Sequence, residues 1–250
     1  MIYYKRYNHL INQFFLIQYP MQNGDFHLSE FLRYLSCGKV KVGERIPSLS
    51  QLSRELGISI ASLREQLEVA RIMGLVEVRP RTGIRLLPYQ FKPAVLQSLY
   101  YSLSQNAETF LEFSDLRTHI ETSYWYEAVG LLNSEDYQQL RMIVQRAKEK
   151  LSSNPPQIPH QEHRLLHLTI FKRLENPFVQ GLLEAYWEVY EAVGLDVYTD
   201  FAYLERVWQY HEKMVAAICK QNFNEGYDAL VEHMDLIYQR SKRPSYQTFE

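Results

Sequence analysis

Residues 47–74 read PSLSQLSRELGISIASLREQLEVARIMG, and this stretch decides the fold of the first part of the chain. Ser48 is followed three residues later by Gln51, the spacing of a capping box in which each side chain binds a free backbone amide of the first helical turn. A helix therefore begins at Ser48 and ends at Gly57, and a second helix begins after the short break that ends at Ser59. Two short helices joined by a three-residue turn predict a helix-turn-helix.

The segments on either side of this stretch complete a small domain. Residues 26–37 carry an apolar stripe with helical period, which predicts a further helix. Residues 75–78 and 84–87 are rich in apolar side chains and predict two strands, joined by a basic turn that contains proline and glycine. A helix-turn-helix followed by a strand pair is a winged helix, and we assign it to residues 24–90.

Beyond Pro93 the sequence is helical almost throughout. Asn176 followed by Pro177 is an N-cap with proline at the first helical position, which fixes one helix start. We expect about six to seven helices and no strands, so residues 93–243 form an all-α bundle and the whole chain is mostly α. Residues 1–23 fit neither domain and are an N-terminal extension, for which packing is favoured over a functional arm.

The composition fits a folded protein of two domains. The 250 residues are 46% hydrophobic and 22% charged, which excludes fibrous and wholly disordered classes. The two cysteines, Cys37 and Cys219, match no disulfide framework or metal spacing. No apolar run approaches the roughly 18 residues of a membrane helix, so we expect a cytoplasmic protein with no membrane partner.

The net charge of −2 conceals two parts of opposite sign. Residues 1–92 carry 13 Lys and Arg against 7 Asp and Glu, whereas residues 93–250 carry 14 against 22. The first part can therefore meet a polyanion such as double-stranded DNA, and the second cannot readily do so.

A helix-turn-helix places the amino end of its second helix in the major groove, and a wing can follow the backbone or the minor groove. We assign DNA contacts to residues at the start of the second helix, in the wing and at the cap of the first helix. In the second helix they are Ser59, Ala61, Ser62 and Arg64; in the wing they are Arg79, Arg81 and Thr82; the cap is Ser48. The alternative is local: Ser59 only caps its helix, and Arg64 pairs with Glu68 one turn on.

Six of the eight histidines lie in the second part of the chain, and four of them favour a metal site. His163 and His167 are four residues apart and so share one helical face. His211 and His233 lie on two further predicted helices, among apolar neighbours that should turn inward. Four imidazoles from three helices could therefore meet in the bundle core and hold a divalent metal. The alternative is that each ring makes its own local hydrogen bond.

The first part resembles the winged helix of GntR-type bacterial transcription regulators. The resemblance spans about fifty residues, up to the wing glycine Gly83, and rests on four segments: 38–47 (GKVKVGERIP), 52–59 (LSRELGIS), 63–67 (LREQL) and 74–76 (GLV). It implies a homodimer that binds a palindromic operator, with DNA contacts at Ser59, Ser62, Arg64 and the wing glycine Gly83. The family often has arginine where this chain has Ser50 and Ile60, which implies weaker binding or a different operator.

The second part resembles the FCD ligand-binding domain of the FadR branch of this family. The matching residues are 117–121 (RTHIE), 163–167 (HRLLH), Asn176-Pro177, 211–218 (HEKMVAAI) and His233. In that family an aspartate and three histidines bind a divalent metal, often zinc or nickel, and a small carboxylic acid can bind beside it. The resemblance places the three histidine ligands at His167, His211 and His233. Where the family has the aspartate ligand, this chain has His163.

This exchange of an acid for an imidazole favours zinc, nickel or copper over manganese and makes the site more positive. The resemblance also places a carboxylate-binding arginine at Arg117, which could fork onto an acidic effector. Its alternative partner is Glu121, four residues on along the same helix.

Three functions remain. The first is a transcription regulator whose operator binding responds to a small organic acid. The second is a DNA-binding protein whose metal site is purely structural and which has no effector. The third, a metal-dependent enzyme, is disfavoured because Glu162 and Glu212 each adjoin a predicted ligand and so face away from the site. We therefore expect that the protein is not an enzyme.

Overall fold

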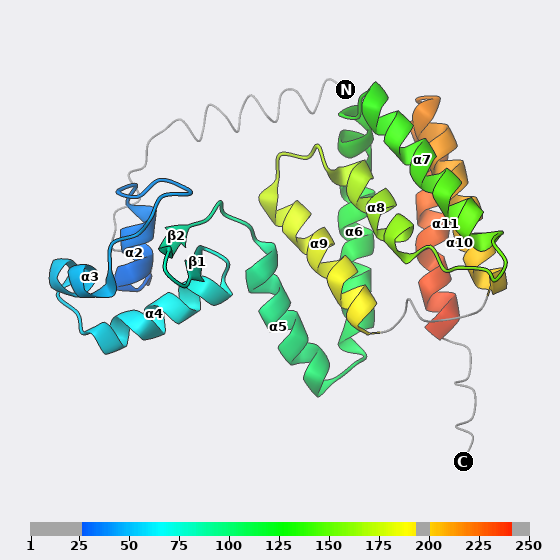
Figure 1. The fold of residues 1–250 in the computed structure, drawn as a ribbon. Coiled ribbons are helices and arrows are strands. Elements are labelled where there is room, and N and C mark those ends of the chain that lie inside the picture. Colours follow the sequence, from blue (N-terminus) through cyan, green and yellow to red (C-terminus); the bar gives the residue numbers. More distant parts are fainter. Residues whose placement is uncertain (1–26, 194–200, 242–250) are drawn as a thin grey trace, which may run out of the picture. The chain divides into compact units, whose positions relative to one another are not determined.

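A computed structural model describes residues 27–193 and 201–241, with side chains to residue 236 (Figure 1). The N-terminal extension at 1–23 and the predicted break after Gly194 lie outside the described residues. Backbone contacts divide the chain into two units. The first runs to Ala70 and includes Val78–Leu86, and the second includes Arg71–Glu77 and everything from Leu87 onward.

The winged helix is built from α2 (Glu30–Ser36), α3 (Leu49–Leu56), α4 (Ile60–Ile72), β1 (Val76–Arg79) and β2 (Gly83–Leu86). The predicted capping box begins α3: the Ser48 side chain accepts from the Gln51 amide, and the Gln51 side chain accepts from the Ser48 amide. At the other end, Gly57 has φ +69°, a left-handed conformation that glycine adopts without strain. These two features fix the length of the helix before the turn.

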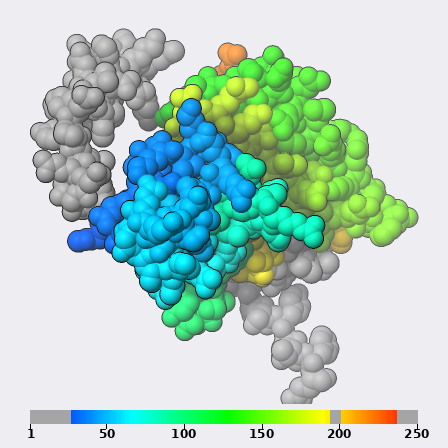
Figure 2. Space-filling model, turned by 60° about the vertical axis from the view of Figure 1, so that its left-hand side comes forward, coloured from blue at the N-terminus to red at the C-terminus, as the bar shows by residue number. Residues whose placement is uncertain are grey.

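The core of the first unit joins the three helices to the wing. Phe31, Leu52 and Leu63 are completely buried, one from each helix, and Figure 2 shows the outer face of this unit from blue to cyan. The wing has a third strand-like segment, because the Ile46 amide donates to the Ile84 carbonyl at 2.8 Å. Arg45 forms the matching bridge with Arg85.

From Leu87 onward the described part of the second unit is all helical, and Figure 1 shows these helices packed side by side from green to red. Seven helices lie within its described residues: α5 (Lys92–Gln105), α6 (Thr109–Gly130), α7 (Ser134–Leu151), α8 (His160–Phe171), α9 (Pro177–Ala192), α10 (Phe201–Cys219) and α11 (Phe223–Ser241). Helix α6 packs against α8, α9 and α11, while α10 packs against α7 and α11. The helices that carry the candidate metal ligands therefore surround one core.

The predicted fold class is confirmed, and two details are more exact in the structure. Asn176 caps α9 as expected, accepting from the amides of Phe178 and Val179 at 3.1 and 3.2 Å. The strands are shifted by one residue relative to the prediction, because the wing turn is confined to residues 80–82, where Arg81 has φ +66°. Among the described residues, no helix is long and apolar enough to cross a membrane.

Candidate metal centre and nucleic-acid interface

The four predicted histidine ligands meet inside the second unit. His163 and His167 come from α8, His211 from α10 and His233 from α11. One nitrogen atom from each ring lies within 4.8 Å of the others. The two Nε2 atoms of His167 and His211 are 3.2 Å apart, close to the separation of about 3.3 Å between nitrogen ligands of a tetrahedral zinc ion.

The chemistry of the cluster fits a metal. His167, His211 and His233 are buried and His163 is half-buried. Two buried ring nitrogens that a shared ion could satisfy have no hydrogen-bond partner, namely His163 Nε2 and His233 Nδ1. His211 Nδ1 also has none, but His211 would offer the ion its Nε2. Such atoms are rare in folded proteins unless something outside the chain satisfies them. A shared divalent ion would account for a cluster that four separate local hydrogen bonds do not explain.

Burial also prepares these rings for coordination, because it disfavours the charged imidazolium. Burial and the neighbouring imidazoles hold the pKa values of His163, His211 and His233 well below the usual range. The pKa of His167 is lowered by burial too, although Glu121 opposes the shift. Metal ligation needs the neutral imidazole, and these four rings are neutral at neutral pH.

A buried carboxylate orients one of the rings. Glu121 on α6 is completely buried, and its Oε2 lies 2.9 Å from Nδ1 of His167. A hydrogen bond in which Nδ1 donates to this carboxylate leaves the lone pair on Nε2 of the same ring as the one that can bind metal. Arg117 Nη2 lies 3.3 Å from this Nε2. From the sequence, Glu121 was considered only as a partner for Arg117. The two residues share one face of α6, however, so an inward-facing Arg117 already indicates that Glu121 faces inward too.

Arg117 connects this carboxylate to an aromatic wall. Its Nε donates to Glu121 Oε1 at 2.8 Å, so the alternative pairing is formed, and its Nη2 lies 3.0 Å from His167 Nδ1. Burial raises the pKa of Glu121, but the charges of Arg117 and His167 and their hydrogen bonds outweigh it and bring the pKa to about 2. The guanidinium carbon lies 4.5 Å from the ring centre of Tyr186 and 4.8 Å from that of Trp187.

Tyr186 and Trp187 are further candidate site residues, which the sequence did not single out from the other aromatic side chains. Both are buried, and neither Tyr186 Oη nor Trp187 Nε1 has a hydrogen-bond partner. The Trp187 ring also contacts two histidines of the cluster, with centroid distances of 4.6 Å to His163 and 5.1 Å to His167. Two unsatisfied polar groups therefore lie beside the metal cluster and the arginine.

The two carboxylates adjoining the ligands face away, as expected. Glu162 forms an ion pair with Lys150 at 2.7 Å. Glu212 is exposed and pairs with Lys148. Neither is placed to act as a general base on water at the histidine cluster.

In the first unit, the amino end of α4 presents the predicted groove-reading residues. Ser59 caps α4, since its Oγ accepts from the Ser62 amide at 3.1 Å, and Ser62 Oγ accepts from Gln66 at 3.3 Å. Ala61 and Arg64 are exposed. In the part of the chain that the structure describes, Arg64 forms no ion pair, so the alternative pairing with Glu68 is absent.

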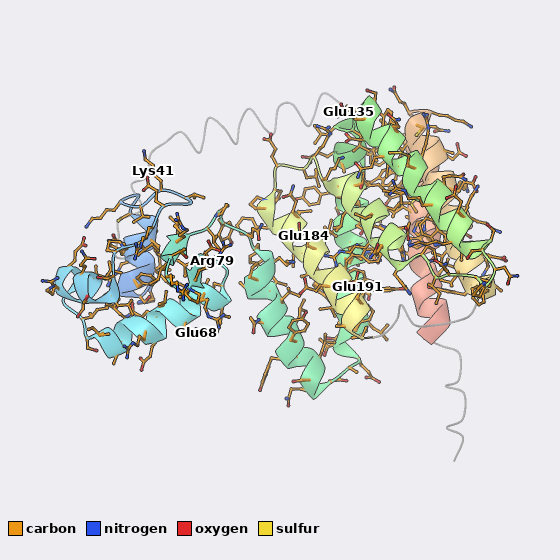
Figure 3. All side chains as sticks on the ribbon, in the orientation of Figure 1. Lys41, Glu68, Arg79, Glu135, Glu184 and Glu191 are labelled. Atoms are coloured by element: carbon orange, nitrogen blue, oxygen red, sulfur yellow. The ribbon has the colours of Figure 1, made fainter. Side chains whose placement is uncertain are left out.

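The wing presents a second basic surface. Arg79, labelled in Figure 3 at the end of β1, is exposed together with Arg81 and Thr82. Gly83 has φ +83°, and a Cβ atom there would lie 2.8 Å from Nε of Arg45. The glycine therefore leaves room for the Arg45 side chain to cross the wing. Arg45 is a further basic residue of the wing that was not among the predicted DNA contacts.

The predicted contact Ser48 is also exposed, but its hydroxyl takes part in the capping box of α3. It lies at the start of the first helix of the motif, away from the reading helix in sequence. A phosphate contact from Ser48 would therefore have to share this hydroxyl with the cap.

Comparison with known proteins identifies the family. The FCD domain family matches residues 112–236, half of the chain. The Uxu operon regulator of Haemophilus influenzae is 23% identical over 208 residues, covering 81% of this chain and 76% of that protein. The Uxu operon transcriptional regulator of Escherichia coli K12 is 25% identical over 203 residues, covering 79% and 78%.

A solved structure has the same fold. Streptococcus agalactiae GntR superposes with a TM-score of 0.62 at 16% identity, covering 84% of this chain and 96% of that one. The winged helix and the helical bundle of the structure are consistent with these sequence and structural matches. This chain belongs to the GntR family of transcription regulators and carries an FCD domain.

Proposed function

We propose that this regulator binds a divalent metal, zinc or nickel, through His163, His167, His211 and His233, and that a small carboxylic acid bound beside the metal modulates its binding to DNA. The observation that carries the proposal is the convergence of four neutral imidazoles from three helices, with buried nitrogens of His163 and His233 unpartnered. A bound metal would supply a Lewis acid that attracts an anion. The ligand set contains no carboxylate, so the metal would keep its full positive charge for such an anion.

Arg117 is the candidate partner for the acid. Its guanidinium has five N–H donors, and Glu121 occupies only part of them. Tyr186 Oη and Trp187 Nε1 could add hydrogen bonds, since an indole N–H only donates and therefore requires an acceptor such as a carboxylate or hydroxyl oxygen. These groups favour a polar acid over an aliphatic one.

DNA binding is assigned to the exposed amino end of α4 and to the wing. Arg64 is the charged side chain of the reading helix that can reach a base edge or phosphate, while Arg79, Arg81 and Thr82 would contact the backbone. Ser48, Ser59, Ser62 and Gly83 complete the assignment. A homodimer would place two such reading heads on a palindromic operator.

The two halves would be coupled by a shift in population. An acid can alter operator affinity only if it binds two arrangements of the protein unequally. Because the described bundle packs side chains closely around Arg117, an entering acid must displace some of them, which gives it the means to favour one arrangement.

Fluorescence anisotropy of operator duplexes tests the proposal. Duplexes bound by the full chain are first selected from a random pool, and the affinity of the zinc-loaded protein is then measured with a panel of hydroxy, keto and sugar acids. We expect at least one acid to change the affinity in the wild type but not in Arg117→Lys, which keeps the charge and loses the fork. A metal-loaded protein whose operator affinity responds to none of the acids would favour the purely structural metal site.

A further inference from the structure

A small hollow in the second unit leads to the histidine cluster from one side. It is walled by the start of α8, by Tyr190 of α9 and by the first turns of α10, including Leu204 and Trp208. Its volume is about 20 Å³, enough for one water molecule or one ion. It is too small for a metabolite.

His163 is the link between the hollow and the cluster. It is the half-buried member of the four, and its ring forms part of the wall of the hollow. The other three rings are at most 6% exposed and do not line it. An ion entering through the hollow therefore meets His163 before it meets the buried histidines.

A fifth histidine stands at the same hollow. His160 lies three residues before His163, so the two share one face of α8, and both line the hollow. The rest of the lining is apolar or aromatic and contains no carboxylate. Glu191, which follows Tyr190 in the sequence and is labelled in Figure 3, does not line the hollow and is paired with Arg164 at 3.3 Å. The lining also offers the phenol oxygens of Tyr190 and Tyr203, which bind zinc or nickel more weakly than imidazole nitrogens do. Imidazoles are thus the best groups to replace water around such an ion on this path.

We infer that this hollow is the route by which the metal enters and leaves the centre, and that His160 is a transient ligand on the route. A divalent ion must lose bound water molecules to pass an aromatic wall. Each lost water that no other ligand replaces raises the free-energy barrier to the passage of the ion. His160 supplies a nitrogen ligand at the mouth and passes the ion to His163. The inference rests on the proposed metal site and adds its path of exchange.

This role predicts a kinetic result that a permanent ligand would not give. A group that contacts the ion only in transit lowers the barrier equally in both directions, so its removal slows uptake and release by the same factor and leaves the dissociation constant unchanged. Removing a ligand of the bound ion would instead weaken the affinity.

The test measures zinc release from the loaded full chain to an excess of chromophoric chelator, with uptake followed separately. His160→Ala should slow both rates about tenfold, the effect of about 1.4 kcal/mol on the barrier, with the dissociation constant within about twofold of the wild type. Leu204→Trp, which fills the hollow, should slow both rates further. Leu165→Trp, an exposed position on α8 outside the hollow, is the control and should leave both rates unchanged.

Circular dichroism checks that each variant is folded, and Leu204→Phe replaces the tryptophan variant if the larger ring is not tolerated. Wild-type release rates in both His160→Ala and the filled variant would overturn the inference, and so would a weakened dissociation constant in His160→Ala. If the wild-type protein binds no zinc at all, the proposed metal site fails instead, so the two failures are distinguishable.

Discussion

Arg117→Met should destabilise the helical bundle strongly, because it leaves a buried carboxylate without its cation. Arg117 is 6% exposed and Glu121 is 0% exposed, and two hydrogen bonds of 2.8 and 3.3 Å join them. Removing one partner of such a pair costs about 3–5 kcal/mol, since the other charge stays buried. For a unit of this size that corresponds to a fall in Tm of about 10 °C.

The matched double variant separates the lost charge from the lost packing. Arg117→Met with Glu121→Gln removes both charges and keeps an acceptor for His167, so it should recover most of the lost Tm. Both variants and the wild type are compared by calorimetry with a chelator present, because bound metal would stabilise each of them to a different extent.

The effect should also depend on pH with a definite sign. The pKa of Glu121 is about 2 in the folded protein, below its ordinary value of 4.5, so its contribution to stability is complete above about pH 4.5 and is lost as the pH falls toward 2. In Arg117→Met the same carboxyl should titrate above its ordinary value. The difference in Tm between the two proteins should therefore shrink from pH 7 to pH 4. An Arg117→Met protein that melts with the wild type, or no more readily than the double variant, would refute this reasoning.

Arg64→Ala should weaken operator binding without altering the fold, whereas the exposed Arg141→Ala on α7 should not; equal affinity across a salt series would refute the groove assignment. Arg81→Ala should lower affinity on all sequences alike and reduce the salt slope by about one, as measured by anisotropy at several salt concentrations. Asp136→Asn should lower Tm at pH 7, and by progressively less as the pH falls below about 4. Burial raises the Asp136 pKa, but Arg173 and Lys172 bring it well below 3.8, so its contribution is complete above 3.8 and is lost only as the pH falls toward the lower folded pKa; a pH-independent loss in the Tm series would contradict this.

Local signals in the sequence predicted most helix boundaries. The capping box at Ser48 and Gln51 and the cap at Asn176 involve groups within three residues of one another, so their spacing is visible without a structure. The wing was less well defined. Its strands shift by one residue because Arg81 adopts a left-handed conformation, which is uncommon for a residue other than glycine or asparagine.

The sequence predicted which histidines form the cluster, but it did not predict the side chains that hold them in place. Helical period places His163 and His167 on one face, and apolar neighbours turn His211 inward. That Glu121 accepts from His167 depends on how α6 packs against α8, 46 residues away along the chain, and no local pattern encodes this contact. The hollow beside His160 likewise arises from three helices together.

Metal analysis of the purified full chain is the measurement on which the account depends. After loading with zinc and removal of unbound ions by gel filtration, inductively coupled plasma mass spectrometry should find one zinc ion per chain in the wild type. His211→Ala combined with His233→Ala should contain almost none, because two of four ligands are gone and the remaining pair lies on a single helix. Full zinc content in this variant, or none in the folded wild type, would contradict the four-histidine centre.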